Sequence, residues 1–189
     1  VVFAWTKKEF NNLEKARKAK VRVPLPIAFT KNVLIMEFIG ENGNAARTLR
    51  VEKNIDLVEA YFTIINAMAN LYKANLVHAD LSEYNVLVKG NEYIIIDMGQ
   101  GVLLTHPKAK DFFERDCKNI AHFFSKKGMK KTQQDVYDEV KKLIKDSKKD
   151  WPYKTSIEKV EKSLNSKGWK NHPAARVLFF ENIPYRLLA

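Results

Sequence analysis

VHADLSEYNVLVKGNEYIIIDMGQG occupies residues 77–101 and contains the pattern from which the rest of the chain is interpreted. Two short apolar runs, Val86–Val88 and Tyr93–Ile96, are separated by a Gly-Asn pair that is typical of a tight turn. The pattern predicts a β-hairpin. Because the two strands of a hairpin run in opposite directions, we expect Asn85 before the first strand and Asp97 after the second to lie at the same end.

Three polar side chains in this stretch suit phosphoryl transfer. Asn85 and Asp97 would supply the hard oxygen atoms that Mg²⁺ prefers, and this ion usually takes only one or two ligands from a protein when phosphate is bound. Asp80, on the loop before the hairpin, would remain free to orient or deprotonate an attacking hydroxyl or water. The sequence therefore predicts Asp80 and Asp97 as catalytic residues, and Asn85 and Asp97 as metal ligands.

The same residues match two motifs of protein kinases. HADLSEYN at residues 78–85 follows the catalytic-loop pattern, with Ala79 in place of the usual arginine, and DMG at residues 97–99 stands where Asp-Phe-Gly would stand. Each motif is weak alone, but both together, joined by strand, turn and strand, indicate a phosphotransferase. We expect His78 to fix the loop structurally, because a lone histidine is more often a buried hydrogen-bonding group than a catalyst.

At these residues the chain resembles the RIO family of atypical kinases, and its type-one subgroup in particular. HADLSEYNVL and IIIDMGQGV carry the resemblance, together with WTKKEFNNLEKA, RVPLPIAF, NVLIMEFIG and THPKAKDFFERDCKNIAHFF in the same order, over roughly residues 3–145. The resemblance implies an α+β, protein-kinase-like fold. Part of the N-lobe would occupy residues 1–39, a mainly helical C-lobe without an activation segment residues 40–149, and an unassigned extension residues 150–189.

The resemblance also implies a site for ATP with Mg²⁺ or Mn²⁺. Met36 would be the gatekeeper residue, and Glu37 and Ile39 would present backbone groups to adenine. Glu9 would pair with the ATP-binding lysine of the family. A second interpretation of Glu9 stays open, since Thr6–Glu9 also fits a helix capping box in which the glutamate reaches back to the cap amide.

Two features of ordinary kinases are missing from the sequence. No Gly-rich phosphate loop and no strand lysine of the Val-Ala-Ile-Lys type precede the catalytic loop, so we expect this chain to be the later part of a longer protein. Between Gly101 and Pro107 there is no room for an activation segment. The RIO family shares this second omission, which disfavours phosphorylation of peptide side chains and leaves ATP binding and hydrolysis intact.

Composition limits the class of protein. The chain has 189 residues, 46% of them hydrophobic, which is enough for one packed domain, and no apolar run reaches the ~18 residues of a membrane span. The single cysteine, Cys117, permits no internal disulfide and fits a reducing, cytoplasmic location. The formal charge of +11 favours an acidic partner such as RNA and, with equal weight, a solvated lysine-rich surface.

Periodicity and capping patterns predict the remaining elements. Helices are expected at residues 6–20, 56–75, 107–127, 132–149 and 155–168, a strand at 33–38 and a polar loop at 41–53. The phenylalanine-rich face of the third helix is expected in the core, together with Cys117. Asp116 on that helix is expected to cap a terminus or pair with a base, and it receives no catalytic role.

Three functions are compatible with these observations. The resemblance favours an ATP-dependent RIO-type serine/threonine kinase or ATPase, from a family that acts in maturation of the small ribosomal subunit. In that family the metal-binding aspartate, here Asp97, has been proposed to carry a transient aspartyl-phosphate. The alternatives are a basic RNA-binding assembly factor that uses ATP as a conformational ligand, and an inactive scaffold. The expected partners are ATP and the pre-ribosomal small subunit with its RNA, and no membrane.

Overall fold

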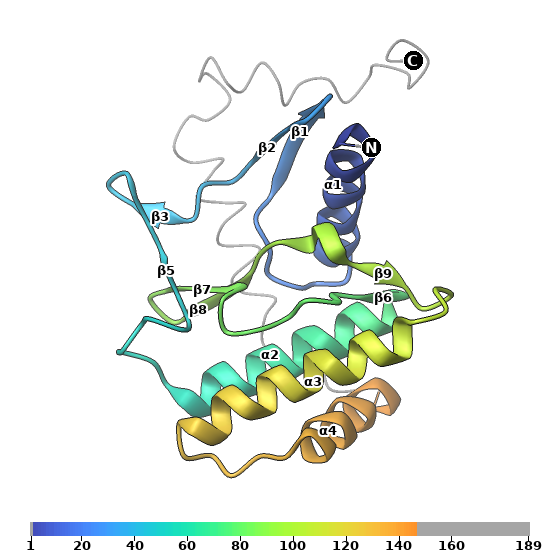
Figure 1. Cartoon of the computed structure of the whole chain (residues 1–189). Helices are drawn as coiled ribbons and strands as arrows, with labels where there is room; N and C mark the ends of the chain where they lie inside the picture. Colours follow the sequence, from blue (N-terminus) through green and yellow to red (C-terminus); the bar gives the residue numbers. More distant parts are fainter. Residues whose placement is uncertain (1, 147–189) are drawn as a thin grey trace.

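The computed structural model describes residues 2–146, with a helix against a small sheet in the upper part and a layer of helices in the lower part (Figure 1). The expected extension at residues 150–189, with its helix at 155–168, lies outside the described residues. In chain order the elements are α1 (Val2–Lys18), β1 (Pro26–Thr30), β2 (Val33–Met36), β3 (Gly40–Glu41), β4 (Asn44–Ala45), β5 (Arg47–Thr48), α2 (Leu57–Lys73), β6 (Leu76–Val77), β7 (Val86–Lys89), β8 (Glu92–Ile95), the 3₁₀ turn η1 (Met98–Gln100), β9 (Val102–Leu103), α3 (Ala109–Lys126) and α4 (Gln133–Lys145).

The upper part consists of α1 packed on the antiparallel pair β1–β2. The rings of Phe10 on α1 and Phe29 on β1 lie 4.8 Å apart between centroids, which joins the helix to the sheet. The predicted helix start at Thr6 is wrong, because α1 begins four residues earlier and Thr6 is a buried residue within it. No Gly or Pro interrupts residues 2–5, so nothing local stops the helix there.

The predicted polar loop at residues 41–53 contains strands. β3 and β4 form a small hairpin around Asn42 and Gly43, whose φ angles are +49° and +78°. This Asn-Gly pair is the usual sequence of a two-residue hairpin turn, a local signal that the prediction passed over. The next strand, β5, pairs with β7 and completes a three-stranded sheet in the order β5–β7–β8.

Two strand pairings position residues 77–101. β7 and β8 pair antiparallel as predicted, with Val86 opposite Ile95. β6, which leads into the stretch, pairs with β9, which follows it, so that Val77 lies opposite Val102. Residues 78–101 therefore begin and end at the same two-stranded sheet, formed by β6 and β9.

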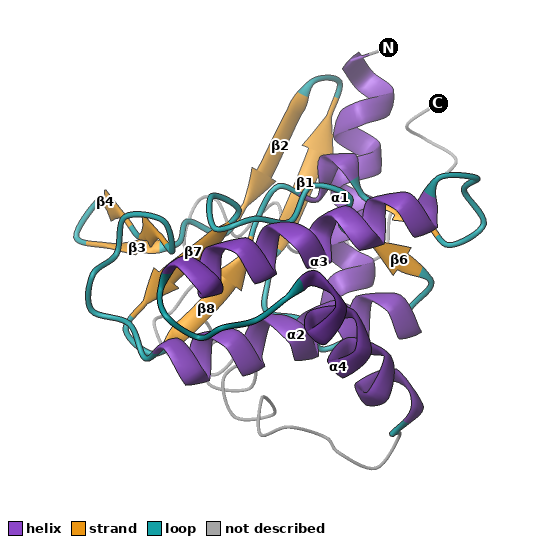
Figure 2. Ribbon diagram, turned by 60° about the horizontal axis from the view of Figure 1, so that its bottom comes forward, coloured by secondary structure: helices purple, strands orange, loops and turns teal. Residues whose placement is uncertain are grey.

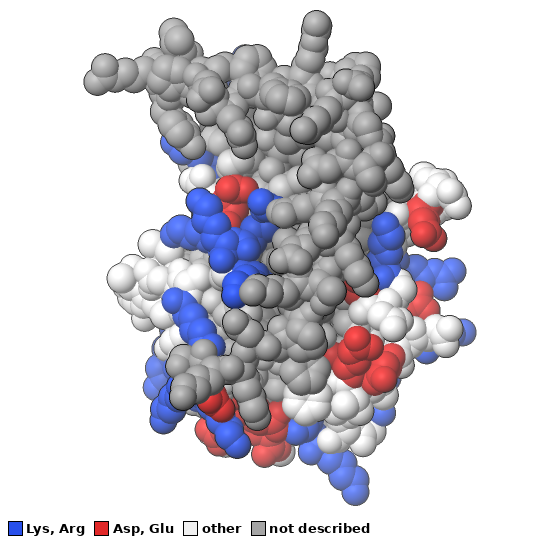
Figure 3. Space-filling model, turned by 180° about the vertical axis from the view of Figure 1, so that it is seen from behind, with Lys and Arg blue, Asp and Glu red and all other residues white. Residues whose placement is uncertain are grey.

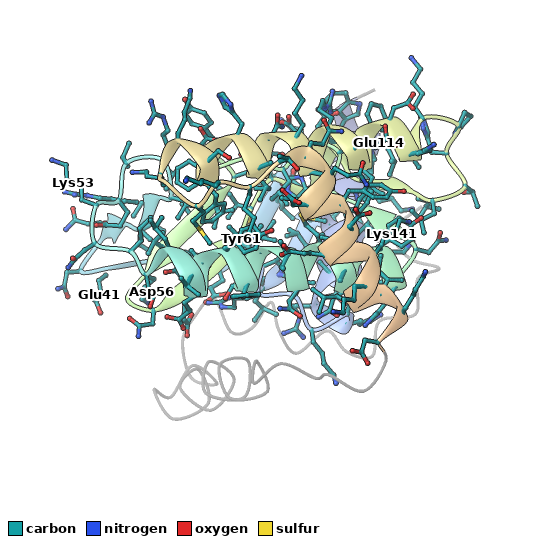
Figure 4. The ribbon with its side chains drawn as sticks, turned by 90° about the horizontal axis from the view of Figure 1, so that it is seen from below. Glu41, Lys53, Asp56, Tyr61, Glu114 and Lys141 are labelled. Carbon is teal, nitrogen blue, oxygen red and sulfur yellow. The ribbon has the colours of Figure 1, made fainter. Side chains whose placement is uncertain are left out.

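The lower part is a layer of α2, α3 and α4 on one side of β7 and β8 (Figure 1, Figure 2). Asp56, where the sequence predicts the second helix to begin, caps α2 and accepts hydrogen bonds from the Val58 and Glu59 amides. Figure 4 views this layer from below and labels Tyr61 on α2 and Lys141 on α4. The Tyr61 hydroxyl donates to the carboxylate of Glu139 at 2.9 Å, which joins α2 to α4 through a buried ring.

α3 begins two residues later than expected. Pro107 lies in a turn before the helix, which starts at Ala109, and the chain leaves the helix through Gly128 at a φ of +98°, where glycine is favoured. Only residues 104–108 connect β9 to α3, so the described chain has no activation segment, as predicted. Among the described helices, none combines the length and apolar character that crossing a membrane requires.

Candidate active site

The β7–β8 hairpin brings the two predicted metal ligands, Asn85 and Asp97, to one end. The Ile96 amide donates to the Asn85 carbonyl at 3.0 Å, which extends the strand pairing by one step beyond β8. Asp97 is the next residue along the chain. The side chains of Asp80 and Asp97 are exposed, and that of Asn85 is half-buried, so all three residues are accessible to a ligand.

The side chain of Asn85 is already oriented by the catalytic loop. Its Nδ2 atom donates to the Asp80 carbonyl at 2.8 Å, which leaves Oδ1 as the oxygen available to a metal. Together with the Asp97 carboxylate, this gives the hard oxygen donors that Mg²⁺ takes from protein, so the residues present fit such an ion. Within residues 2–146, no three His, Cys, Asp or Glu side chains form a metal-binding group by themselves, and phosphate and water would complete the ligand set.

Helix α3 holds the loop that carries Asp80. The buried carboxylate of Asp116 accepts hydrogen bonds from the amides of Ala79 and Leu81, each at 2.9 Å. Arg115 donates to the Ala79 carbonyl. Ala79 has a φ of +66°, in the left-handed region that a residue with a Cβ atom rarely adopts, so these contacts stabilise a strained turn.

Asp116 is therefore the residue whose importance the sequence prediction missed. It neither caps a helix nor acts mainly as a partner of a base, but binds the backbone on both sides of Asp80. Its buried place on a phenylalanine-rich helix face was the available signal, because a carboxylate is seldom buried without a specific partner. Burial raises its pKa to about 7, although the Leu81 and Ala79 amides act in the opposite direction.

The side chains of Cys117 and His78, close to this loop, are both buried. Burial raises the pKa of the Cys117 thiol to about 12, and its side chain lies in the core, as the sequence predicted. His78 is buried, and burial lowers its pKa. Its Nε2 atom lies 3.0 Å from the Ile96 carbonyl, and since a carbonyl only accepts, this nitrogen carries the hydrogen. The contact ties the catalytic loop to the residue before Asp97.

Glu9 on α1 lies near Asp97, one of the two predicted metal ligands. A Cβ atom added at Gly99 would be 3.6 Å from the Glu9 carboxylate and 3.5 Å from that of Asp97. Burial, and then the charge of Asp97, raise the pKa of Glu9. The capping-box interpretation is wrong, because Thr6 does not begin the helix. A cation between the carboxylates of Glu9 and Asp97 would relieve their repulsion.

The predicted hinge runs from β2 toward β3. Met36 ends β2 and is 38% exposed. The Glu37 amide donates to the Leu25 carbonyl at 2.8 Å, and the Ile39 carbonyl accepts from the Ala46 amide at 2.9 Å. Among the backbone hydrogen bonds of the described residues, none uses the Glu37 carbonyl or the Ile39 amide, so this acceptor and this donor are available.

An ion pair between the buried Arg22 and the partly buried Glu37 holds this hinge in place. The guanidinium of Arg22 donates to both carboxylate oxygens of Glu37, at 2.8 and 2.9 Å, and to Glu92 on β8 at 3.3 Å. The same Glu37 carboxylate accepts from the Leu25 amide at 3.1 Å. Arg22 thus links the hinge to the sheet that contains β7 and β8, and the Glu37 side chain is bound by Arg22 and the Leu25 amide.

Comparison with known proteins gives one consistent result. The sequence profile of the RIO domain matches residues 1–167. The RIO-type serine/threonine-protein kinase Rio1 of Haloferax volcanii is 44% identical over 138 residues, covering 73% of this chain and 48% of that protein. The Rio1 kinase of Thermoplasma acidophilum is 38% identical over 143 residues, covering 75% of each chain. This chain thus spans about half of the first relative and three quarters of the second.

Solved structures show the same fold. The Rio2 kinase of Chaetomium thermophilum matches with a TM-score of 0.63 at 25% identity, covering 94% of this chain and 54% of that chain. A complex of the same kinase with ADP, Mg²⁺ and phosphoaspartate matches with a TM-score of 0.63 at 23% identity, covering 94% of this chain and 52% of that chain. The described residues therefore adopt a protein-kinase-like α+β fold.

Proposed function

Because this chain belongs to the RIO family of serine/threonine protein kinases, we propose that it binds ATP with Mg²⁺ and transfers the γ-phosphoryl group to a serine or threonine hydroxyl, to itself or to water. One observation carries the proposal. The β7–β8 hairpin brings Asn85 and Asp97 to the same end, and the Asn85 amide is bonded to the residue proposed as the base, Asp80.

Each of the three residues has a distinct proposed task. Asn85 and Asp97 would hold the metal. Asn85 uses its Nδ2 atom in a hydrogen bond and keeps its Oδ1 atom available, and Asp97 supplies a carboxylate. When bound, Mg²⁺ (or Mn²⁺) would offset the negative charge of the phosphates. Asp80 would accept the proton of the attacking hydroxyl or water, and its place is set by the contacts of α3 with the backbone on either side of it.

The nucleotide base would lie against the hinge. The Glu37 carbonyl and the Ile39 amide would hydrogen-bond the adenine edge, as the resemblance implied, and Met36 would border the base as gatekeeper. Glu9 would pair with the ATP-binding lysine of the family, which would place a cation beside two carboxylates that now repel each other. The two hydrogen bonds of the Glu37 side chain with Arg22 support this proposal, because they keep the hinge backbone in one conformation.

Water is a favoured acceptor in this proposal. The short connection of residues 104–108 leaves no activation segment to hold an extended peptide beside Asp80. A Rio2 complex contains phosphoaspartate, which suggests a route through Asp97. An Asp97 oxygen would bond to the γ-phosphorus as the bond to the ADP oxygen breaks, and water would then release phosphate and restore the carboxylate, with Asp80 taking the proton. We therefore include ATPase activity in the proposal.

The pre-ribosomal small subunit and its RNA are the proposed partners, in the cytoplasm. The formal charge of +11 supports an acidic partner. Basic and acidic side chains are interspersed over the described surface in Figure 3, so charge does not single out a contact face there. The same charge supports a second candidate function, an RNA-binding assembly factor for which ATP is only a conformational ligand.

Substitution of the three residues in the full-length protein tests the proposal. Asp97→Asn should abolish turnover and weaken Mg·ATP binding, because a charged ligand becomes neutral, and Asn85→Ala should have a milder effect. Asp80→Asn should lower turnover by on the order of 10²–10⁴-fold while ATP still binds. Asp138→Asn, on the exposed face of α4, is the matched control and should change neither quantity.

Two assays separate the candidate functions. Steady-state phosphate release is measured beside radiolabel transfer to protein, with and without small-subunit particles. Phosphate release should exceed transfer to added peptide, and particles should stimulate it. ATP turnover at the wild-type rate by the Asp97 variant would contradict the ligand assignment. ATP-sensitive binding to particles without turnover in the wild-type protein would favour the assembly-factor function instead.

A further inference from the structure

Asn12 joins α1 to the turn that follows Asp97. Its side chain is 6% exposed, and its Nδ2 atom donates hydrogen bonds to the Met98 carbonyl at 2.8 Å and to the Gly101 carbonyl at 3.1 Å. An amide nitrogen carries two hydrogens, so both donors are used. One side chain thus binds both ends of the turn, across 86 and 89 residues of sequence.

The helix and the turn are in close contact around this side chain. A Cβ atom at Gly101 would lie 2.9 Å from the Asn12 Nδ2 atom, closer than such atoms approach in proteins. Glu9, three residues before Asn12 on the same side of α1, lies near Gly99 in the middle of the turn. Figure 1 shows the lower half of α1 standing against the turn before β9. Neither partner can move without disturbing the other.

The backbone of Asp97 needs such support. Its φ of 59° and ψ of 64° lie in the left-handed region, which aspartate tolerates better than most residues but which is still strained. A strained conformation of this kind persists when the surrounding contacts determine it. The Asp97 side chain makes no capping hydrogen bond to the turn within the described structure, so Asn12 supplies the contacts that hold the residues immediately after it.

We propose that Asn12 is a positioning residue for the metal ligand Asp97, an inference that rests on the phosphotransfer function proposed above. By binding both ends of the turn, Asn12 keeps the Asp97 carboxylate within reach of the ion that Asn85 also binds. It also couples metal affinity to the position of α1, because Asn12 and Glu9 lie on the same helix. Loss of the Asn12 hydrogen bonds therefore weakens metal binding.

A purely structural role predicts a different pattern. In that case, removing the two hydrogen bonds would lower the melting temperature, because two buried carbonyl groups lose their donors, but the affinity of the folded protein for metal would stay the same. The two roles are therefore separated by metal affinity measured on folded protein, and thermal stability alone does not distinguish them.

Asn12→Leu is the informative variant, because leucine has a similar shape and no donor. Asn11→Leu is its matched control, since Asn11 is the exposed neighbour on the same helix. Binding of Mn²⁺ to each full-length protein in the presence of ATP is followed by electron paramagnetic resonance, beside ATP affinity at saturating Mn²⁺ and the melting temperature. Mn²⁺ binding should weaken roughly 10–100-fold in Asn12→Leu, as for other residues that orient a metal ligand, and should not change in Asn11→Leu.

The outcomes separate this inference from the proposed function. If the wild-type protein binds no Mn²⁺ with ATP, the proposed function fails. If the wild-type protein binds Mn²⁺ and the folded Asn12→Leu protein binds it equally well, only the role of Asn12 is refuted. Should the leucine variant not fold, Asn12→Ser replaces it, because a hydroxyl can donate one hydrogen bond of the two. An intermediate loss of affinity then supports the role, and wild-type affinity refutes it.

Discussion

Replacement of Asp116 by alanine should both destabilise the protein and disorder the loop that carries Asp80. The carboxylate lies on α3 and accepts the amides of Ala79 and Leu81, on either side of Asp80, at 2.9 Å each. Alanine cannot accept either hydrogen bond. Within the described structure, the left-handed φ of +66° at Ala79 would then be supported only by the hydrogen bond from Arg115 to the Ala79 carbonyl.

The expected loss of stability follows from the two amides. A buried donor left without a partner costs about 1–3 kcal/mol, so two donors give about 2–6 kcal/mol. Burial of the carboxylate is itself unfavourable and raises the pKa of Asp116 to about 7. Its removal therefore offsets part of the loss of stability. We therefore expect Asp116→Ala to lower the free energy of unfolding by about 1–4 kcal/mol. Asp116→Asn, which keeps one acceptor oxygen, should lose less.

The effect on turnover is expected to exceed the effect on ATP binding. Asp80 would lose its fixed position, and a displacement of about 1 Å in a catalytic group can lower a rate by about 10²-fold. The proposed adenine contacts lie on the hinge, away from α3, so KM for ATP should change little. Asp111→Ala is the matched control on the exposed start of the same helix, where the loss should stay within about 1 kcal/mol.

Urea denaturation followed by circular dichroism gives the free energy of unfolding, and phosphate release gives kcat and KM at a temperature where every variant is folded. Destabilisation of Asp116→Ala with wild-type kcat would show that the carboxylate only supports folding. An unchanged free energy of unfolding would refute the hydrogen-bond argument itself. Equal losses in Asp111→Ala would show that the effect comes from the helix and not from the Asp80 loop.

Three further predictions use the same denaturation measurement. Burial raises the pKa of Asp116 from 3.8 in the unfolded chain to about 7 in the folded protein. Between these two values the folded protein keeps a proton that the unfolded chain releases. The contribution of protonated Asp116 to stability is therefore full below about pH 4 and lost by about pH 7. Over that range, stability should fall with rising pH more steeply in wild-type protein than in Asp116→Asn, by up to about 1.4 kcal/mol per pH unit, and equal slopes would contradict the raised pKa. Arg22→Met should lower the free energy of unfolding by about 2–4 kcal/mol, because it leaves the partly buried Glu37 carboxylate without its cation, whereas Lys89→Met, on an exposed strand end, should stay within about 0.5 kcal/mol. Asp56→Ala should lose about 1 kcal/mol by removing the cap of α2 without changing ATP turnover, and a changed kcat would show that this helix end reaches the site.

Features with a short-range cause could be predicted from the sequence. The β7–β8 hairpin follows from two apolar runs and a turn pair, and the cap at Asp56 follows from a side chain that bonds amides two and three residues away. The hairpin alone was enough to place Asn85 and Asp97 at one end. Their roles, and that of Asp80, remain predictions that the variants above would test.

Local patterns also failed where the cause was not local. The capping pattern at Thr6 predicted a helix start, yet α1 begins at Val2, because capping residues also occur inside helices that continue past them. The loop expected at residues 41–53 contains β5, a two-residue strand that exists only through its pairing with β7. A strand this short has no periodicity, so the sequence carries no sign of it.

The supports of the site were decided by tertiary structure alone. Asp116 binds amides 37 and 35 residues away, and Asn12 binds carbonyls 86 and 89 residues away. A hydrogen bond between distant segments leaves no spacing rule in the sequence, because its partners are backbone groups that every residue carries. The sequence by itself thus determined which side chains are candidates for the chemistry, and the packing of α1 and α3 determined what holds their loops in place.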